Sequence, residues 1–483
     1  MTTEGTVQSR ISNMFRQKHL LWLVLFFVLS RILLYQFFPF RFNRINDFMQ
    51  FLDPALLQGD LLDALWHLHV QPPLHNLLIG LVLKLVPTGL QAHVLAFLYV
   101  LLAFGVILGL YWLLVHRDVR PAIAFGVSTF FSIFPPFIWA ERLPAYVLPI
   151  MFSLVMMTIT LQRYIETRRL FFGATFLLLA IYLPLTRSFF HLIIWMAPVI
   201  LGFLFVVWKI DRRHLLRYSA IAFFGFTLVA SFYLKNVLEY GSLSGSTWQG
   251  MNLAGLVMYV PKEKIQEMVK NDEITPLALI PRLSPPSVYY HYYDRSPLHE
   301  HSALDNTIKS TGHINWNNRI YAEAAREYQH NTFTIARTYP LYTLLAITNQ
   351  AYIFCGLSGY RYFNRPDRWW IPRTDTPFHF LFDVLNIYLL PLLFFLLIAI
   401  ALLNFVRTFR QANQRLKSAA AIDPLLVTNL FIGGTVLYVI VIACFAELGE
   451  GHLMRIQIDP LLAVTAGLLV ERSIRWKAAR RNL

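Results

Sequence analysis

The chain has 483 residues, of which 56% are hydrophobic and 14% are charged. Soluble globular proteins are on average about 45–50% apolar and about 25% charged. Here the apolar residues form long runs, and about 20 of them suffice to cross about 30 Å of hydrocarbon, so composition excludes an ordinary soluble protein. The net charge of +15 comes mostly from Lys and Arg between the runs, which favours anionic lipid headgroups and argues against nucleic acid as a partner.

The N-terminal residues 1–18 are polar and weakly basic. The apolar run that follows is too long for a removable signal peptide and has no small-residue cleavage pattern, so we expect it to be a spanning helix. The two cysteines, Cys355 and Cys444, do not suggest a disulfide framework, because Cys444 lies inside another apolar run.

The apolar runs predict an all-α polytopic membrane protein with about ten transmembrane helices. The expected spans are 19–39, 92–115, 121–140, 143–162, 170–186, 189–208, 218–235, 381–406, 424–446 and 456–472. The charges between them support this count. With the N-terminus in the cytoplasm, every basic cluster falls on the cytoplasmic side, and the short outer loops carry mainly single arginines, namely Arg142, Arg187 and Arg455. Both termini are therefore predicted to be cytoplasmic.

The segment 72–86 is apolar but only about 15 residues long, which is short for a span. Counting it as a span would also place the following basic clusters outside. We therefore expect an interfacial helix on the outer leaflet, with Lys84 near the headgroups.

We divide the chain into three regions. Residues 1–235 form an N-terminal transmembrane module that includes the first outer loop, 40–91. Residues 236–380 are expected to form a small helical cap outside the membrane, because 318–329 and 339–354 have helical patterns and no segment alternates strictly. Residues 381–483 supply the last helices and a basic cytoplasmic tail. No internal repeat of the kind found in inverted-repeat transporters is present.

The first outer loop concentrates ionisable residues. It carries four aspartates and three histidines: Asp47, Asp53, Asp60, Asp63, His67, His69 and His75. Asp47 lies eight residues past the first span, where a carboxylate is costly unless it is solvated, paired or functional. A salt bridge to Arg44 or Arg41 is the alternative to a functional role. His69 and His75 are candidate ligands for a divalent metal, although no tight metal-binding motif is present.

Other outer segments carry isolated charged residues. Glu141 and Arg142 follow a Pro-Pro break, and an ion pair between them within the loop is the alternative to a functional role for Glu141. Arg187, between two spans, suits a lipid phosphate or ordinary headgroup contact. After the seventh span, Lys235, Asn236, Trp248 and Asn252 suit a sugar or a packed loop. The last outer loop contains Glu447, Glu450, His452 and Arg455, which form either a phosphate site or a structural ion network.

These features together resemble the GT-C superfamily of membrane glycosyltransferases, most closely the family 39 and aminoarabinose-transferase-like branch that uses polyprenyl-phosphate sugars. The shared pattern is an acidic residue past the first helix, a Gly-Asp pair at Gly59-Asp60, and a Pro-Pro-Leu at 72–74. Where relatives often have Lys or His before the prolines, this chain has Gln71, with His69 two residues earlier.

The resemblance implies a GT-C-like fold and an inverting transfer of a sugar from a polyprenyl-phosphate donor to a hydroxyl of a glycan, lipid or protein. Asp47 and Glu141 are then the expected catalytic residues. Donor phosphate is expected at Arg187, Lys235 and Arg455, and substrate at Arg44, His69, Trp248, Asn252 and Glu450.

The main alternative is a membrane transporter or flippase for a lipid-linked saccharide, which would place charges inside the spans. The spans look almost free of charge, which favours chemistry at the outer face. A non-catalytic scaffold would leave the acids in three outer loops unexplained. The absence of an Asn-x-Ser/Thr sequon and the likeness to bacterial members predict a bacterial inner membrane.

Overall fold

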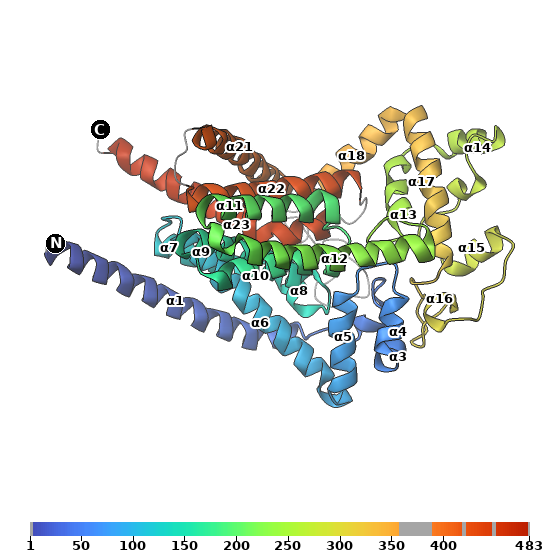
Figure 1. The fold of residues 1–483 in the computed structure, drawn as a ribbon, viewed down its shortest axis with the longest axis horizontal. Coiled ribbons are helices and arrows are strands. Elements are labelled where there is room, and N and C mark those ends of the chain that lie inside the picture. The colour runs from blue at the N-terminus through green and yellow to red at the C-terminus, as the bar shows by residue number, and fades with distance from the viewer. Residues whose placement is uncertain (1–2, 357–388, 418–421, 447–450, 482–483) are drawn as a thin grey trace, which may run out of the picture.

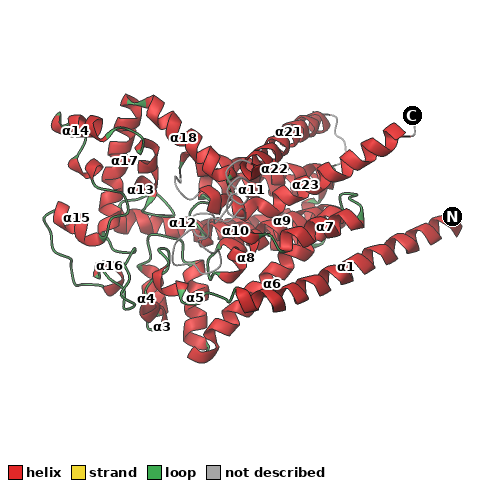
Figure 2. Cartoon of the chain, turned by 180° about the vertical axis from the view of Figure 1, so that it is seen from behind, coloured by secondary structure: helices red, strands yellow, loops and turns green. Residues whose placement is uncertain are grey.

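The structure is a computed structural model that describes residues 3–356, 389–417, 422–446 and 451–481. Throughout these ranges the regular elements are helices and there is no strand. A single isolated antiparallel bridge joins Ile308 and Ile314. The prediction of an all-α protein is confirmed for this part of the chain (Figures 1 and 2).

Eight helices in the described ranges are long and apolar enough to cross a membrane. They are Gln17–Phe37 in α1 (Thr3–Phe37), α6 (Thr88–Val115), α9 (Val147–Thr167), Leu192–Ile210 with α11 (Ala197–Ile210), Arg212–Tyr240 with α12 (Leu215–Tyr240), Pro391–Arg415 in α21 (Leu390–Lys417), α22 (Pro424–Phe445) and Leu453–Arg480 in α23 (Gly451–Arg481). These long apolar helices are compatible with a multi-pass membrane protein.

The two remaining predicted spans are helical but less regular. α7 (Pro121–Ser132) and α8 (Pro135–Arg142) are bent by 56° at the Pro-Pro break, and together they count as one further span if the bend lies within the membrane. α10 (Leu170–Thr186) has 17 residues and contains Pro184. A proline removes a helical hydrogen bond and bends or shortens the helix that carries it. Because both of these segments are bent or short, the count of ten spans remains a prediction.

The spanning helices form an elongated bundle with a separate group of helices at one end. Figure 1 shows the start of α1 and the end of α23 at one end of the bundle, and Figure 2 shows the same arrangement from behind. The short helices of the first outer loop and of the cap lie at the opposite end. Both termini are thus on one side of the bundle, and the candidate chemistry is on the other.

The first outer loop consists of four short helices: α2 (Arg44–Asp47), α3 (Pro54–Gln58), α4 (Leu61–Trp66) and α5 (Leu74–Leu85). Asp53 caps α3 and Asp60 caps α4 by accepting hydrogen bonds from backbone N–H groups. α5 has 12 residues, which rise about 18 Å, well short of a membrane core. It packs against α3 and α4, as the predicted non-spanning helix would; its position at the lipid interface remains a prediction.

The cap contains α13 (Gln249–Leu253), α14 (Lys262–Lys270), α15 (Pro286–Tyr292), α16 (Ser302–Asp305) and α17 (Ile320–Thr338). α18 (Pro340–Cys355) leads from the cap back to the bundle, where it contacts α22 and α23 (Figure 1). The cap and the first outer loop share one hydrophobic core, which includes Leu57, Leu68, Trp248, Tyr289 and Tyr321. Two segments far apart in the sequence therefore fold as one unit.

The contact between α13 and α17 requires glycine at position 250. A Cβ atom there would lie 1.7 Å from the carbonyl oxygen of Ala325, which belongs to the helix backbone and has little room to move. We expect Gly250→Ala to destabilise the cap by at least the roughly 1–3 kcal/mol that overpacking usually costs, seen as faster limited proteolysis of the cap. Gly126→Ala is the control, because a Cβ there meets nothing within 4 Å. Equal proteolysis of both variants would contradict this packing.

Candidate functional site

Asp47 ends α2 and is paired with Arg44. The Arg44 Nη1 donates to Asp47 Oδ2 at 2.6 Å, and both side chains are partly exposed. This is the salt bridge that the sequence left open. The second oxygen, Oδ1, is buried and makes no hydrogen bond. A buried, unbonded carboxylate oxygen is costly, so this atom is a reasonable acceptor for a proton or a hydroxyl group of a ligand.

Lys309, from the cap, is the nearest cation that sequence reasoning missed. It is 4% exposed, and its Nζ donates to the carbonyl oxygens of Phe51 at 2.7 Å and Phe48 at 3.3 Å. Burial lowers the pKa of Lys309 to about 8, and the nearby Asp53 and Asp47 oppose that shift. No local pattern around Lys309 indicates this position, because it depends on the cap folding over the first outer loop.

The neighbouring Asp53 has a structural role. Its Oδ1 accepts from the N–H of Ala55 at 3.0 Å, and its carboxylate also accepts from the backbone N–H and hydroxyl of Ser310. Thr311 adds a bond from its hydroxyl to the carbonyl oxygen of Asn46 at 3.3 Å. Residues 309–311 of the cap thus hold the turn that carries Asp47.

Arg187 is fully buried beside the same loop. Its Nη1 donates to Oε1 of Gln50 at 3.3 Å, and its guanidinium lies 4.3 Å from the ring centre of Tyr146. Asn76 fixes Gln50 by donating to its carbonyl oxygen at 3.0 Å. A fully buried guanidinium cannot extend to lipid headgroups as an exposed one does. Arg187 therefore belongs to the interior of the outer face, where it contacts Gln50, which follows Asp47 by three residues.

His75 connects this region to the turn after α8. Its Nε2 lies 2.9 Å from the carbonyl oxygen of Pro144, and its ring stacks on Phe51 at 5.4 Å. The N–H of Arg41 donates to the carbonyl oxygen of Arg142 at 2.9 Å. The loop with Asp47, the turn after Glu141 and the turn with Arg187 are therefore contiguous. We call Arg44, Asp47, Gln50, Arg187 and Lys309 the outer-face site.

Glu141 lies in a buried ion pair. Its Oε2 accepts from Nη2 of Arg31 at 2.7 Å and from Nε of the same residue at 2.9 Å, and Arg142 Nη2 lies 3.4 Å from Oε1. Arg31 lies within the first span, so the expectation of almost uncharged spans is wrong here. Arg31 does not stand out in the sequence, because a single arginine hardly changes the hydropathy of a long apolar run. Glu141 is held between two guanidinium groups, an arrangement typical of a structural carboxylate.

Arg455 is also engaged by protein groups. It is fully buried, with its Nε 3.1 Å from Oδ1 of Asp459 and its Nη1 donating to the carbonyl oxygens of Phe354, Cys355 and Gly356. These carbonyls end α18, where a cation is favourable. Asp459 lies in the predicted span 456–472, so this ion pair also places a charge inside a predicted span. Glu447 and Glu450 lie outside the residues that the structure describes.

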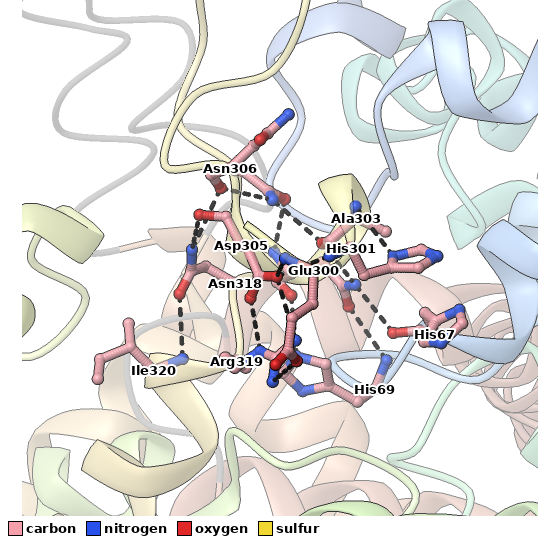
Figure 3. Close-up of polar contacts among 12 residues, drawn as sticks. His67, His69, Glu300, His301, Ala303, Asp305, Asn306, Asn318, Arg319 and Ile320 are labelled. Carbon is pink, nitrogen blue, oxygen red and sulfur yellow. Dashed lines mark hydrogen bonds and ion pairs between the residues drawn. The ribbon is translucent and has the colours of Figure 1, made fainter. Parts of the chain in front are cut away.

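Lys235 and His69 connect the first outer loop to the rest of the protein. Lys235 Nζ donates to the carbonyl oxygens of Trp66 at 3.0 Å and Leu68 at 2.5 Å, at the end of α4. The His69 ring nitrogens lie 2.6 Å from the Thr247 hydroxyl and 2.9 Å from the carbonyl oxygen of Asn317. Figure 3 shows His69 among the polar residues of the cap. Burial lowers the pKa of His69 to about 3, so its ring is neutral at physiological pH.

A metal bound by His69 and His75 does not fit this arrangement. Both nitrogens of His69 and the Nε2 of His75 already have protein partners, and burial lowers the pKa of His75 to about 4. Trp248 is buried edge-on against Trp316 and Tyr321, so it packs the shared core. Asn252 is half-buried, and its carbonyl oxygen accepts from Arg282 at 3.3 Å.

An apolar cavity of about 600 Å³ lies between α11 and the helices α21 and α22. Its wall includes Trp195, Phe405, Phe431 and Tyr438. Along α22 it extends from Leu426 to Tyr438, which is about 18 Å at 1.5 Å per residue. The Tyr438 hydroxyl donates to the carbonyl oxygen of Phe189 and accepts from the N–H of His191 at 3.1 Å. We call this cavity the apolar groove; one end lies beside the turn that follows Arg187.

Lys309→Met should change how stability depends on pH. Between about pH 8, the pKa of Lys309 in the folded protein, and 10.5, its ordinary value, the unfolded chain binds a proton that the folded protein has released. Raising the pH through this window therefore stabilises the wild type, by on the order of 3 kcal/mol, and the variant lacks that gain. Thermal unfolding in detergent across the window measures the difference. Lys262→Met, at an exposed lysine, is the control. Parallel curves of stability against pH for the wild type and Lys309→Met would contradict this prediction.

The chain matches no protein-family model, no curated protein and no solved structure. The residues of the outer-face site and the apolar groove are therefore the basis on which function is assigned.

Proposed function

We propose that the protein is an inverting glycosyltransferase that moves a sugar from a polyprenyl-phosphate donor to an acceptor hydroxyl. One observation carries this proposal. A long apolar groove inside the bundle ends at the turn after a fully buried arginine, Arg187, and that arginine contacts the loop that carries Asp47. The groove would hold a lipid chain, Arg187 would bind its phosphate, and Asp47 would accept a proton, and these three parts adjoin one another.

The donor would place its hydrocarbon chain in the groove and its phosphate near Arg187. A guanidinium suits a phosphate because it offers planar, paired donors. Lys235 and Arg455, the other expected phosphate ligands, already donate to carbonyl oxygens, so they are weaker candidates. Lys309 also donates to carbonyl oxygens, those of Phe48 and Phe51, but we prefer it as the second cation because Asp47 is close enough to act on its charge.

In the reaction, Asp47 Oδ1 accepts the proton of the acceptor hydroxyl as a general base. The hydroxyl oxygen forms a bond to the anomeric carbon, and the bond from that carbon to the phosphate oxygen breaks. The electron pair leaves with the phosphate, whose added negative charge is stabilised by Arg187 and Lys309. A single displacement inverts the anomeric configuration. Arg44 keeps Asp47 oriented through the other carboxylate oxygen.

The acceptor in this proposal is a glycan, lipid or protein at the outer face of a bacterial inner membrane, with both termini in the cytoplasm. The basic residues between spans favour that orientation. A divalent metal is not assigned a step, because none of the described residues of the outer-face site forms a set of metal-ligand atoms.

A transporter or flippase for a lipid-linked saccharide is the second candidate. It is favoured by two buried ion pairs that each include a charged residue of a predicted span, Arg31 with Glu141 and Asp459 with Arg455. Purified protein in liposomes distinguishes the two. Formation of a glycosylated acceptor supports the transferase, whereas movement of the intact lipid-linked sugar between leaflets without transfer supports the flippase.

Asp47→Asn should reduce sugar transfer by about 10²–10⁴-fold, because the amide keeps the size of the side chain but cannot accept the proton. The measurement is product formation by purified protein from a polyprenyl-phosphate sugar. Asp272→Asn is the matched control; this aspartate is exposed in the cap and has a left-handed backbone that Asn tolerates well. Turnover that survives Asp47→Asn, in protein that unfolds at the wild-type temperature, would remove Asp47 from this role.

Filling the groove should impair donors with long chains selectively. Gly202 lines the groove, and a Cβ there meets nothing within 4 Å, so Gly202→Phe adds a ring to open space. We expect a higher KM for a long-chain polyprenyl donor and little change for a short-chain analogue. Gly126→Phe is the control, since it is equally open but is not part of the groove. An equal effect on both donors would show that the chain binds elsewhere.

A further inference from the structure

Asp63, His67 and His301 form a cluster away from the outer-face site. Asp63 and His67 lie one helical turn apart at the end of α4, and His301 precedes α16 in the cap. The Nε2 of His301 lies 2.7 Å from Oδ2 of Asp63, and the Nδ1 of His67 lies 3.3 Å from Oδ1. Both histidines are seen at the seam between the loop and the cap in Figure 3.

The three side chains offer one ligand atom each, and these atoms all lie within 4.8 Å of one another. In a tetrahedral zinc site with bonds of about 2.0–2.1 Å, neighbouring ligand atoms are about 3.3 Å apart. The cluster is therefore compact enough to close around an ion with small side-chain movements. Two imidazoles and one carboxylate are also a ligand set that suits zinc and similar divalent transition metals.

The hydrogen bond of His67 assigns coordination to its Nε2, so side-chain movement must bring Nε2 to the same ion as the Asp63 carboxylate, whose Oδ1 lies 3.3 Å from Nδ1. The Nδ1 of His67 lies 2.9 Å from the carbonyl oxygen of Asp63, so a proton on Nδ1 would be donated there and Nε2 would carry the lone pair. A ring N–H given to a backbone carbonyl is the usual way in which a metal-binding histidine is oriented.

His301 must change more. Its Nε2 donates to Asp63, and its Nδ1 accepts from the N–H of Ala303 at 3.3 Å. Coordination through Nε2 would place the ring proton on Nδ1 instead, and the bond from Ala303 would then be lost. The two imidazole rings stack at 3.7 Å with 28° between their planes, and an ion must lie near the plane of each ring. At least one ring must turn. The side chains are 25% and 23% exposed, so neither is locked by packing.

We propose that Asp63, His67 and His301 bind one divalent transition metal ion of the zinc class, with water completing its coordination. The ion would join α4 to the cap. This seam already contains bonds from Asn317 Nδ2 to the carbonyl oxygen of His67 at 3.0 Å and from Asn317 Oδ1 to the N–H of His69. Asp47 is not among its ligands, so we assign the ion the role of joining the two segments and no step in sugar transfer. The proposal goes beyond sugar transfer and does not depend on it.

The test uses the full-length protein in detergent, stripped of metal with a chelator and titrated with Zn²⁺ by calorimetry. We expect one ion per chain and a higher unfolding temperature when zinc is bound. His301→Ala and Asp63→Asn should each weaken zinc binding by about tenfold or more. His299→Ala is the control, because that histidine is exposed on the same loop and belongs to no ligand cluster.

Two further measurements keep the result decisive. The metal-free unfolding temperature of His301→Ala shows whether the variant still folds. Co²⁺ binding, followed by its visible absorption, reports ligand geometry directly, and the tetrahedral spectrum should be lost in His301→Ala and kept in His299→Ala. Zinc binding by folded His301→Ala that equals the wild type, or no stoichiometric binding by the wild type, would overturn the proposal. Neither outcome depends on whether the protein transfers sugar.

Discussion

Two buried lysines hold the first outer loop by its backbone. Lys235 reaches from the end of α12 to the carbonyl oxygens of Trp66 and Leu68, and Lys309 reaches from the cap to those of Phe48 and Phe51. A buried ammonium group is tolerated only when its protons are given to acceptors, so each lysine fixes the carbonyls that it contacts. The loop between these points has little freedom to move, and everything at the outer face is positioned relative to it.

The polar residues of the outer face therefore fall into two groups, those that hold segments together and those available to a ligand. His69, Asp53 and Lys235 hold segments together, and their hydrogen-bonding atoms face protein partners. Asp47 differs, because one of its oxygens is buried with no partner. Glu141 Oε1 and Asp459 Oδ2 also lack a hydrogen bond, but each of these carboxylates lies in a buried ion pair, whereas Asp47 is partly exposed at the outer face. An unmet hydrogen bond costs stability unless a ligand supplies it, so Asp47 Oδ1 is the candidate contact for a ligand there.

Much of the fold could be predicted from the sequence because long apolar runs can do little else in a membrane. The spans, the helical cap and the short helix at 74–85 follow from hydropathy and length. The bent α7–α8 pair was harder, since the Pro-Pro motif indicates a break but not its angle. Asp47, Arg44 and Arg187 were found as isolated charges at predicted outer positions. Which of these residues contact one another depends on parts of the chain that are far apart in sequence, and the sequence alone does not show it. No local pattern marks Lys309 or Arg31. Arg455 was expected to bind phosphate, but in the structure it donates to carbonyl oxygens at the end of α18.

The pair between Arg31 and Glu141 also has a consequence for biosynthesis. Arg31 lies in the first span, and its partner is 110 residues further along the chain. While α1 enters the bilayer, its guanidinium has no carboxylate, and a charge at membrane depth costs roughly 2.5–3.5 kcal/mol during insertion if it lies near the centre. That penalty is relieved only after α8 has been synthesised and packed. The ion pair that holds Arg31 of the first helix can therefore form only after residue 141 has been synthesised.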